Sequence, residues 1–99
     1  MSESDLLVSK PIVQDIYLVS RTKYLENEKG ATPKEIKDEL TEYEGNEIMK
    51  SIGQMEMHGI LYGYGNVYRP EKRSEWAYLL EKLLKLDPNE VGIEQQARK

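Results

Sequence analysis

The chain has 99 residues, no cysteine, and 14 basic against 18 acidic residues, for a formal net charge of −4. This length suffices for one domain with a modest core but not for two, so part of its stability is expected to come from a partner subunit. The composition excludes disulfides, thiolate metal sites, a thiol nucleophile and the dense positive field of a chromatin-coating protein, while a local basic patch is compatible with it.

No apolar run approaches the roughly 18 residues of a membrane span, and the start of the chain lacks the features of a secretion signal. We therefore expect a cytoplasmic protein that does not contact membranes. Phenylalanine is absent whereas tyrosine occurs seven times. Most of the aromatic surface thus carries a polar hydroxyl, which suits half-exposed positions in a hairpin or an interface.

The first third of the chain is predicted to hold one long helix behind a loose start. Residues 1–10 are polar apart from a short apolar run at 6–8, and termini of this kind are usually loose until another segment docks them. A helix is predicted from about Pro11 to Glu28, and Lys29-Gly30 ends it. Its apolar stripe is formed by Ile12, Ile16 and Val19.

A second helix, from about Thr32 to Leu40, has a start with a physical cause. Thr32 can accept a hydrogen bond from an unpaired backbone N–H, and Pro33 supplies the helical φ at the first position. Glu35 can reach back to the backbone of Thr32 and complete a capping box.

A third helix is predicted to begin near Asn46, which can cap it. Ile48, Ile52 and Met55 follow at i, i+4 and i+7, so they share one buried stripe. The helix should end at Gly59, where a left-handed C-cap requires no Cβ.

A tight two-stranded hairpin is predicted directly after this helix. Residues 60–64 and 67–69 are rich in aromatic and branched side chains, and Gly65-Asn66 between them can supply the positive φ of a two-residue turn. Pro70 ends the strand pair, because proline has no N–H to donate to a neighbouring strand.

The last predicted helix covers residues 74–87, with Ser74 as its cap. Its apolar positions span close to half of the helix circumference, which is more than one core contact requires. The surplus indicates homodimerisation through an interface of Trp76, Leu80, Leu83 and Leu84. The alternative is that the helix folds back across its own domain and buries the whole arc there. Residues 88–99 are expected to form a frayed tail.

This order of helices, glycine and hairpin resembles the winged helix-turn-helix. The run from Ala31 through residues 57–62 to Pro70 is similar to the small winged-helix regulators of prokaryotes, archaea and their viruses and plasmids, and the resemblance covers residues 11–73. It implies a mostly helical domain with a small β-hairpin, to which many members append a dimerisation helix. It also implies a transcriptional regulator that binds double-stranded DNA without a cofactor.

In DNA-binding winged helices, the second helix of the pair enters the major groove while the hairpin, or wing, lies along the backbone or minor groove. The outer face of the third predicted helix offers base contacts from Asn46, Lys50, Ser51 and Gln54, with Gly53 allowing close approach and Met57 also turned outward. Phosphate contacts are assigned to Lys34, Tyr62, Tyr64, Asn66, Arg69 and Lys72. The alternatives are a merely solvated helix face and tyrosines that pack within the sheet or at a subunit contact.

The net charge of individual segments distinguishes between possible partners better than the total charge does. Residues 31–58 hold three lysines against seven acidic side chains, whereas residues 59–73 hold three basic side chains against one glutamate. The predicted wing is therefore basic and the helix pair acidic, and acids that face phosphate lower the affinity for DNA. A protein-interaction module built on the same fold is the second hypothesis, because of the acidic pair and the wide leucine face.

No enzyme is predicted. His58 is the only histidine and stands at a helix end, where capping is favoured over catalysis, and no cysteine or second histidine completes a metal site. The acidic residues at positions 38, 39, 42 and 44 lack the alternating ligands and sharp glycine of a calcium loop. They are interpreted as a solvated face.

Overall fold

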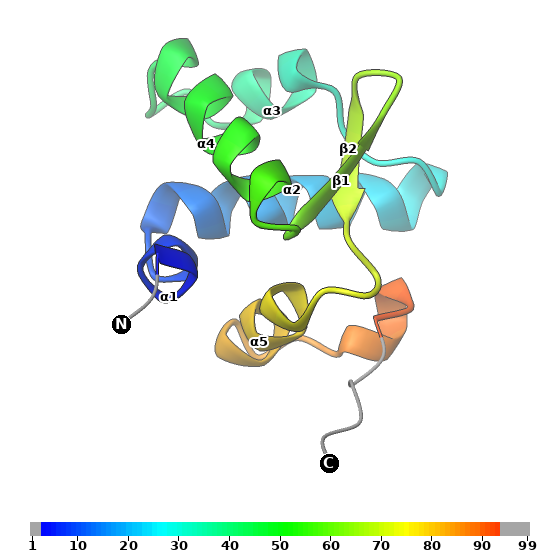
Figure 1. The fold of residues 1–99 in the computed structure, drawn as a ribbon. Helices are drawn as coiled ribbons and strands as arrows, with labels where there is room; N and C mark the ends of the chain where they lie inside the picture. Colours follow the sequence, from blue (N-terminus) through cyan, green and yellow to red (C-terminus); the bar gives the residue numbers. More distant parts are fainter. Residues whose placement is uncertain (1–2, 94–99) are drawn as a thin grey trace.

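The computed structural model describes residues 3–93, which are mostly helical with one two-stranded antiparallel hairpin (Figure 1). This confirms the predicted mixture of helices and a small hairpin. The elements in chain order are α1 (Glu3–Val8), α2 (Pro11–Asn27), α3 (Pro33–Glu39), α4 (Gly45–Met57), β1 (Leu61–Tyr64), β2 (Val67–Pro70), α5 (Glu75–Leu83) and the short 3-10 helix η1 (Pro88–Val91).

Helix α2 is the central element, against which α3, α4, β2 and η1 all pack. In Figure 1 it crosses the middle of the molecule, with α3, α4 and the hairpin on one side and α5 on the other. Its fully buried face is Val13, Ile16, Tyr17 and Ser20, rather than the predicted stripe, in which Ile12 and Val19 are only half-buried. The face is displaced because α2 is covered from two sides, which a single-stripe pattern does not anticipate.

Helix α3 begins as predicted. The backbone N–H of Glu35 donates to Thr32 Oγ1 at 3.2 Å, and the N–H of Thr32 donates to Glu35 Oε1 at 2.9 Å, with Pro33 in the first turn. The hydrogen bond from the Thr32 backbone lowers the pKa of Glu35 below its ordinary value. The capping box is confirmed, and it fixes where α3 enters the core through Ile36.

Helix α4 begins at Gly45, and its cap is Glu44, two residues before the predicted cap Asn46, which lies inside the first turn. The backbone N–H of Glu44 donates to Glu47 Oε1 at 3.4 Å. The stripe of Ile48, Ile52 and Met55 is buried as predicted. The helix ends at Met57, and the chain then turns through Gly59, whose φ is +74°.

The hairpin has the predicted turn, with Gly65 at φ +59° and Asn66 at φ +64°. It is held to the helices by Ala31, whose N–H donates to Tyr68 O at 2.9 Å while its carbonyl accepts from the Tyr68 N–H at 2.8 Å. Gly30, at φ +123°, lies so close to β2 that an added Cβ would be 2.1 Å from Tyr68 O. The junction of α2 and α3 is therefore joined directly to the hairpin.

Residues 88–93 do not form the expected frayed tail. Asp87 accepts a hydrogen bond from the Asn89 N–H at 3.0 Å and starts η1, and Val91 and Ile93 are buried against the rest of the chain. The physical reason is that η1 packs against α2, which removes these apolar side chains from water. The remaining expected tail, residues 94–99, lies outside the described residues.

The start of the chain is also more ordered than expected. Residues 3–8 form α1, and Leu7 and Val8 are buried where α1 meets α2 and α5. Burial of this short apolar run stabilises a segment that composition alone marks as loose.

A buried polar network joins α2 to α5 and η1. Arg21 Nε donates to Glu81 Oε2 at 2.8 Å, and its Nη2 donates to Glu90 Oε1 at 2.8 Å and to the Asp87 carbonyl at 3.0 Å. The hydroxyl of Tyr17 also donates to Glu81 Oε2. Burial, followed by the bond to Glu81, raises the pKa of Tyr17, whereas the pKa of Arg21 is raised by its bonds to both glutamates against the opposing effect of burial.

No helix within residues 3–93 is long and apolar enough to pass through a bilayer.

Candidate nucleic-acid interface

The outermost ridge of α4, defined as Asn46, Lys50, Gly53 and Met57, lies opposite the buried stripe of that helix. All four residues are exposed, and Met57 is 81% exposed. An added Cβ at Gly53 would meet no other atom within 4 Å. The ridge therefore offers one amide, one positive charge and one bare stretch of backbone, and a partner can approach closely at Gly53.

The flank of α4 that faces α1 is less open than predicted. Ser51 is buried, so the prediction that it contacts bases is wrong: the packing of α4 against α2 covers this position as well as the apolar stripe. Gln54 is half-buried and, with His58, lines a hollow of about 200 Å³ beside Leu6 and Lys10. Gln54 is only partly available, because α1 was not expected on this side.

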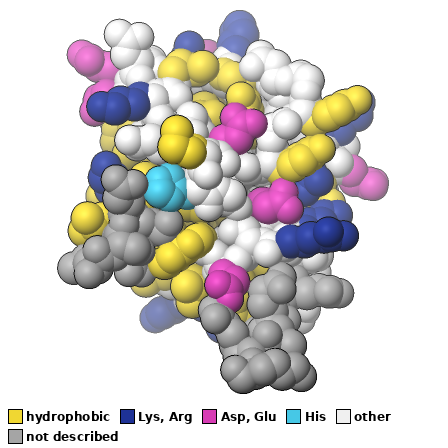
Figure 2. Space-filling model, viewed as in Figure 1, with side chains coloured by type: hydrophobic (Ala, Val, Ile, Leu, Met, Phe, Trp, Pro, Cys, Tyr) yellow, Lys and Arg dark blue, Asp and Glu magenta, His cyan; other side chains and the backbone are white. Residues whose placement is uncertain are grey.

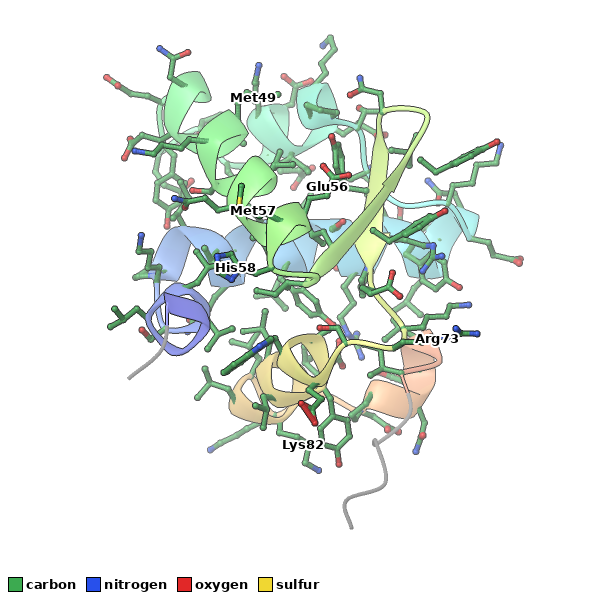
Figure 3. All side chains as sticks on the ribbon, in the orientation of Figure 1. Met49, Glu56, Met57, His58, Arg73 and Lys82 are labelled. Atoms are coloured by element: carbon green, nitrogen blue, oxygen red, sulfur yellow. The ribbon has the colours of Figure 1, made fainter. Side chains whose placement is uncertain are left out.

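The face that carries α4 is mixed rather than basic. Figure 2 shows apolar and acidic side chains towards the middle of this face and lysines and arginines towards its edges. Met49 is exposed on the other flank of α4, and Glu56 projects between α4 and the hairpin (Figure 3). An anionic partner on α4 would thus contact the ridge while passing close to Glu56.

The hairpin presents a separate set of side chains. In a strand, alternate residues face opposite sides. Gly63 faces Glu56 of α4, since a Cβ there would lie 2.8 Å from Glu56 Oε2, so Tyr62 and Tyr64 project from the other side. Tyr62 pairs in register with Arg69, whose guanidinium carbon lies 4.4 Å from the centre of the Tyr62 ring.

A groove lies between this side of the hairpin and the end of α2. It has a volume of about 630 Å³ and is lined by Glu28, Lys29, Tyr62, Tyr64, Gly65, Val67 and Arg69. Lys72 lies nearby, with its Nζ 5.3 Å from the centre of the Tyr24 ring, and the guanidinium carbon of Arg69 lies 5.9 Å from the centre of the same ring. We refer to it as the hairpin groove.

The predicted contact residues thus divide into two groups. Asn46 and Lys50, with the partly covered Gln54, belong to α4, whereas four others line or border the hairpin groove: Tyr62, Tyr64, Arg69 and Lys72. Asn66 lies at the exposed turn of the hairpin. Lys34 is on α3, where its Nζ donates to Asp38 Oδ2 at 3.1 Å in an exposed ion pair.

Sequence reasoning missed Tyr24 and Lys29 as members of this surface. Both are in or just after α2, more than 30 positions before the end of the hairpin that they border. The pairing of Ala31 with Tyr68 brings them together. The only signal in the sequence is the small pair Gly30-Ala31, which permits this close backbone contact.

Helix α5 has a narrower apolar surface than predicted. Leu80 is fully buried, so its assignment to a dimer interface is wrong: it packs into the chain's own core. Leu79 and Leu83 are 47% and 54% exposed, and Trp76 and Leu84 are half-buried. The exposed stripe is therefore Leu79 and Leu83, spaced i and i+4, with the half-buried Trp76 beside it.

The part of the chain that the structure describes holds no cluster of metal-binding side chains. Within residues 3–93, no three histidine, aspartate or glutamate side chains come together as a possible metal site. His58 is the C-terminal cap of α4, and its backbone N–H donates to the Gln54 carbonyl oxygen at 3.0 Å.

Comparison with known proteins finds no family model, curated protein or solved structure that matches this chain. Its function is therefore inferred from the arrangement of its own residues.

Proposed function

We propose that the chain is a homodimeric winged-helix protein that binds double-stranded DNA and regulates transcription. The observation that carries this proposal is the outer ridge of α4, where Lys50 stands next to the bare backbone at Gly53 and none of the four ridge residues is acidic. A helix inserted in the major groove presents such side chains to base edges, with lysine directed at guanine and asparagine at adenine.

The position of the hairpin supports the same function. The Ala31–Tyr68 pairing fixes the hairpin beside the α3–α4 pair, and Asn66 at its turn is exposed. With α4 in a major groove, the hairpin turn would follow the adjacent backbone, where contacts orient a protein without reading sequence.

Dimerisation is proposed through the exposed stripe of α5. Leu79 and Leu83 present adjacent apolar surface one helical turn apart, and a second copy would remove this surface from water. Binding of the two copies to successive major grooves requires their α4 ridges to lie about 34 Å apart in the dimer.

A mobility-shift titration with a mixed-sequence duplex at low salt tests this function. We expect binding that weakens steeply with salt, and Lys50→Ala should weaken it and lower the slope of log affinity against log salt by about 1. Lys85→Asn is the matched control, because it removes one charge after α5 at a left-handed position (φ +60°) that asparagine tolerates. Absence of a shift at low salt would overturn the proposal.

A protein-interaction module is the second candidate, and a specific observation favours it. Met49 and Met57 are exposed on α4, and the same helix carries the exposed acidic side chains Glu47 and Glu56. Methionines suit adaptable protein contacts, whereas carboxylates oppose phosphate. A defined protein partner retained at high salt, without co-purifying nucleic acid, would support this candidate over DNA binding.

A further inference from the structure

The hairpin groove combines aromatic rings with positive charge in a way that the α4 ridge does not. Tyr64 lines the groove and is 78% exposed, and the Arg69 guanidinium lies over the Tyr62 ring. An exposed ring of this kind offers a flat face to another aromatic group.

Two cations line the groove and a third lies near it, beside Tyr24. The lining pair is Lys29 and Arg69, the third cation is Lys72, and the opposing charge among the lining residues is Glu28. The guanidinium of Arg69 is held by the rings and by its Nη1, which donates to Pro70 O at 3.0 Å. A positive charge held on an aromatic surface is already oriented for an anion.

We propose that the hairpin groove binds an unpaired nucleic-acid strand, with a base stacked on Tyr64 and neighbouring phosphates paired with Arg69, Lys29 and Lys72. Exposed aromatic rings beside positively charged side chains match the chemistry of a single strand, whose unpaired bases offer stacking faces and whose backbone carries regular negative charge. The groove volume of about 630 Å³ is in the range of small-ligand sites, and the groove is not enclosed.

This site is separate from the proposed duplex contact of α4. Tyr62 and Tyr64 project from the side of the hairpin opposite to Gly63, and Gly63 faces Glu56 of α4. Binding in the groove therefore does not depend on Lys50, and the two proposals can fail independently.

Fluorescence anisotropy with a labelled ten-nucleotide thymidine strand tests the proposal on the full chain. We expect binding at low salt that weakens about tenfold in Tyr64→Ala, since loss of one stacking partner has an effect of this order. Tyr64→Phe should bind like the parent chain, because it keeps the ring. Arg69→Gln should also weaken binding and reduce its salt dependence.

Two controls decide between stacking on this site and general attraction to positive charge. Lys85→Asn should leave strand binding unchanged, and a ten-unit abasic strand should bind about tenfold more weakly than the thymidine strand. Equal binding of the abasic strand, equal losses in Lys85→Asn and Arg69→Gln, or no binding at low salt would each overturn the proposal. If free thymidine monophosphate binds as tightly as the strand, the groove is a mononucleotide site and the proposal of a strand is wrong.

Circular dichroism and urea unfolding of Tyr64→Ala keep the test interpretable. Tyr64 is exposed and pairs only with Val67 at the end of the hairpin, so the variant should unfold close to the parent chain. Weaker strand binding with unchanged unfolding would support a direct contact, and unchanged strand binding in the folded variant would overturn it.

Discussion

The guanidinium of Arg21 on α2 is paired with the carboxylate of Glu81 on α5 at 2.8 Å, with 7% and 0% of the two side chains exposed. Glu81 is fully buried, and the Tyr17 hydroxyl shares the same carboxylate oxygen. The position of α5 therefore depends on charge compensation in the interior as well as on apolar packing.

Removing one partner of this pair should be costly. We expect Arg21→Met to lower the free energy of unfolding by about 3–5 kcal/mol, because Glu81 would keep a buried charge without its cation. The double variant Arg21→Met with Glu81→Gln should recover most of the loss, since Gln still accepts the Tyr17 hydroxyl and carries no charge. Urea unfolding measures both. A double variant no more stable than Arg21→Met would contradict the role of charge.

Gly30→Ala should disrupt the attachment of the hairpin. A Cβ at Gly30 would lie 2.1 Å from Tyr68 O, at a φ of +123° that side chains rarely adopt, so we expect a loss of roughly 3 kcal/mol or more in urea unfolding. Gly65→Ala is the matched control: its φ is also positive, +59°, but no atom lies within 4 Å. Its expected loss is about 1–2 kcal/mol, and equal losses in the two variants would refute the steric explanation.

Gly53→Ala should separate stability from DNA binding. The added methyl group meets no atom within 4 Å and lies inside α4, so the free energy of unfolding should rise by about 0.5–1 kcal/mol. Duplex affinity should fall, because the methyl group stands between the helix backbone and the bases. Thermal unfolding and a mobility shift measure the two effects. A more stable variant with unchanged affinity would place the duplex away from this ridge.

Charge on the exposed stripe of α5 should abolish the proposed dimer. Leu79→Lys with Leu83→Lys places two cations where the second copy would pack, so light scattering should report a monomer. Leu25→Lys, on α2, is the control, since Leu25 is as exposed as Leu79, at 47%. A parent chain that is already monomeric at high concentration would rule out this interface.

Alkaline pH should reveal the hydrogen bond between α2 and the loop before α4. The Tyr43 hydroxyl donates to Asp15 Oδ2 at 2.7 Å, and this bond raises the pKa of Tyr43 to about 12. Because the pKa in the folded state is the higher one, the stabilisation is complete below pH 10 and is lost as the pH rises through 12. Unfolding free energies measured across this interval should fall more for the parent chain than for Tyr43→Phe. Parallel pH profiles would contradict the assignment.

Local features were predictable from the sequence because their interactions span only a few residues. The capping box of Thr32 and Glu35, the Gly65-Asn66 turn and the Ser74 cap are all observed. Each satisfies backbone groups within three positions or fewer, so no knowledge of the tertiary structure is required.

The errors arose where distant segments meet. Nothing near Val91 in the sequence explains its burial, because its segment is bound at Glu90 by Arg21, which lies 69 positions away. Leu80 and Ser51 belong to helices whose apolar faces were identified, but the extent of each buried arc is set by neighbouring elements. Likewise, alternation within the strands predicts that Tyr62 and Tyr64 share a side, but not that Lys29 borders them.

The dependence of Arg21 on residues 81 to 90 also sets the order in which a newly synthesised chain can mature. The ribosome releases α2 long before α5 and η1. Until residue 90 has emerged, the Arg21 guanidinium therefore lacks its carboxylate partners and stays hydrated, and one face of α2 remains uncovered. Translation arrest after the hairpin would consequently leave an immature intermediate with the side of α2 that receives η1 uncovered, a natural target for chaperones and proteases.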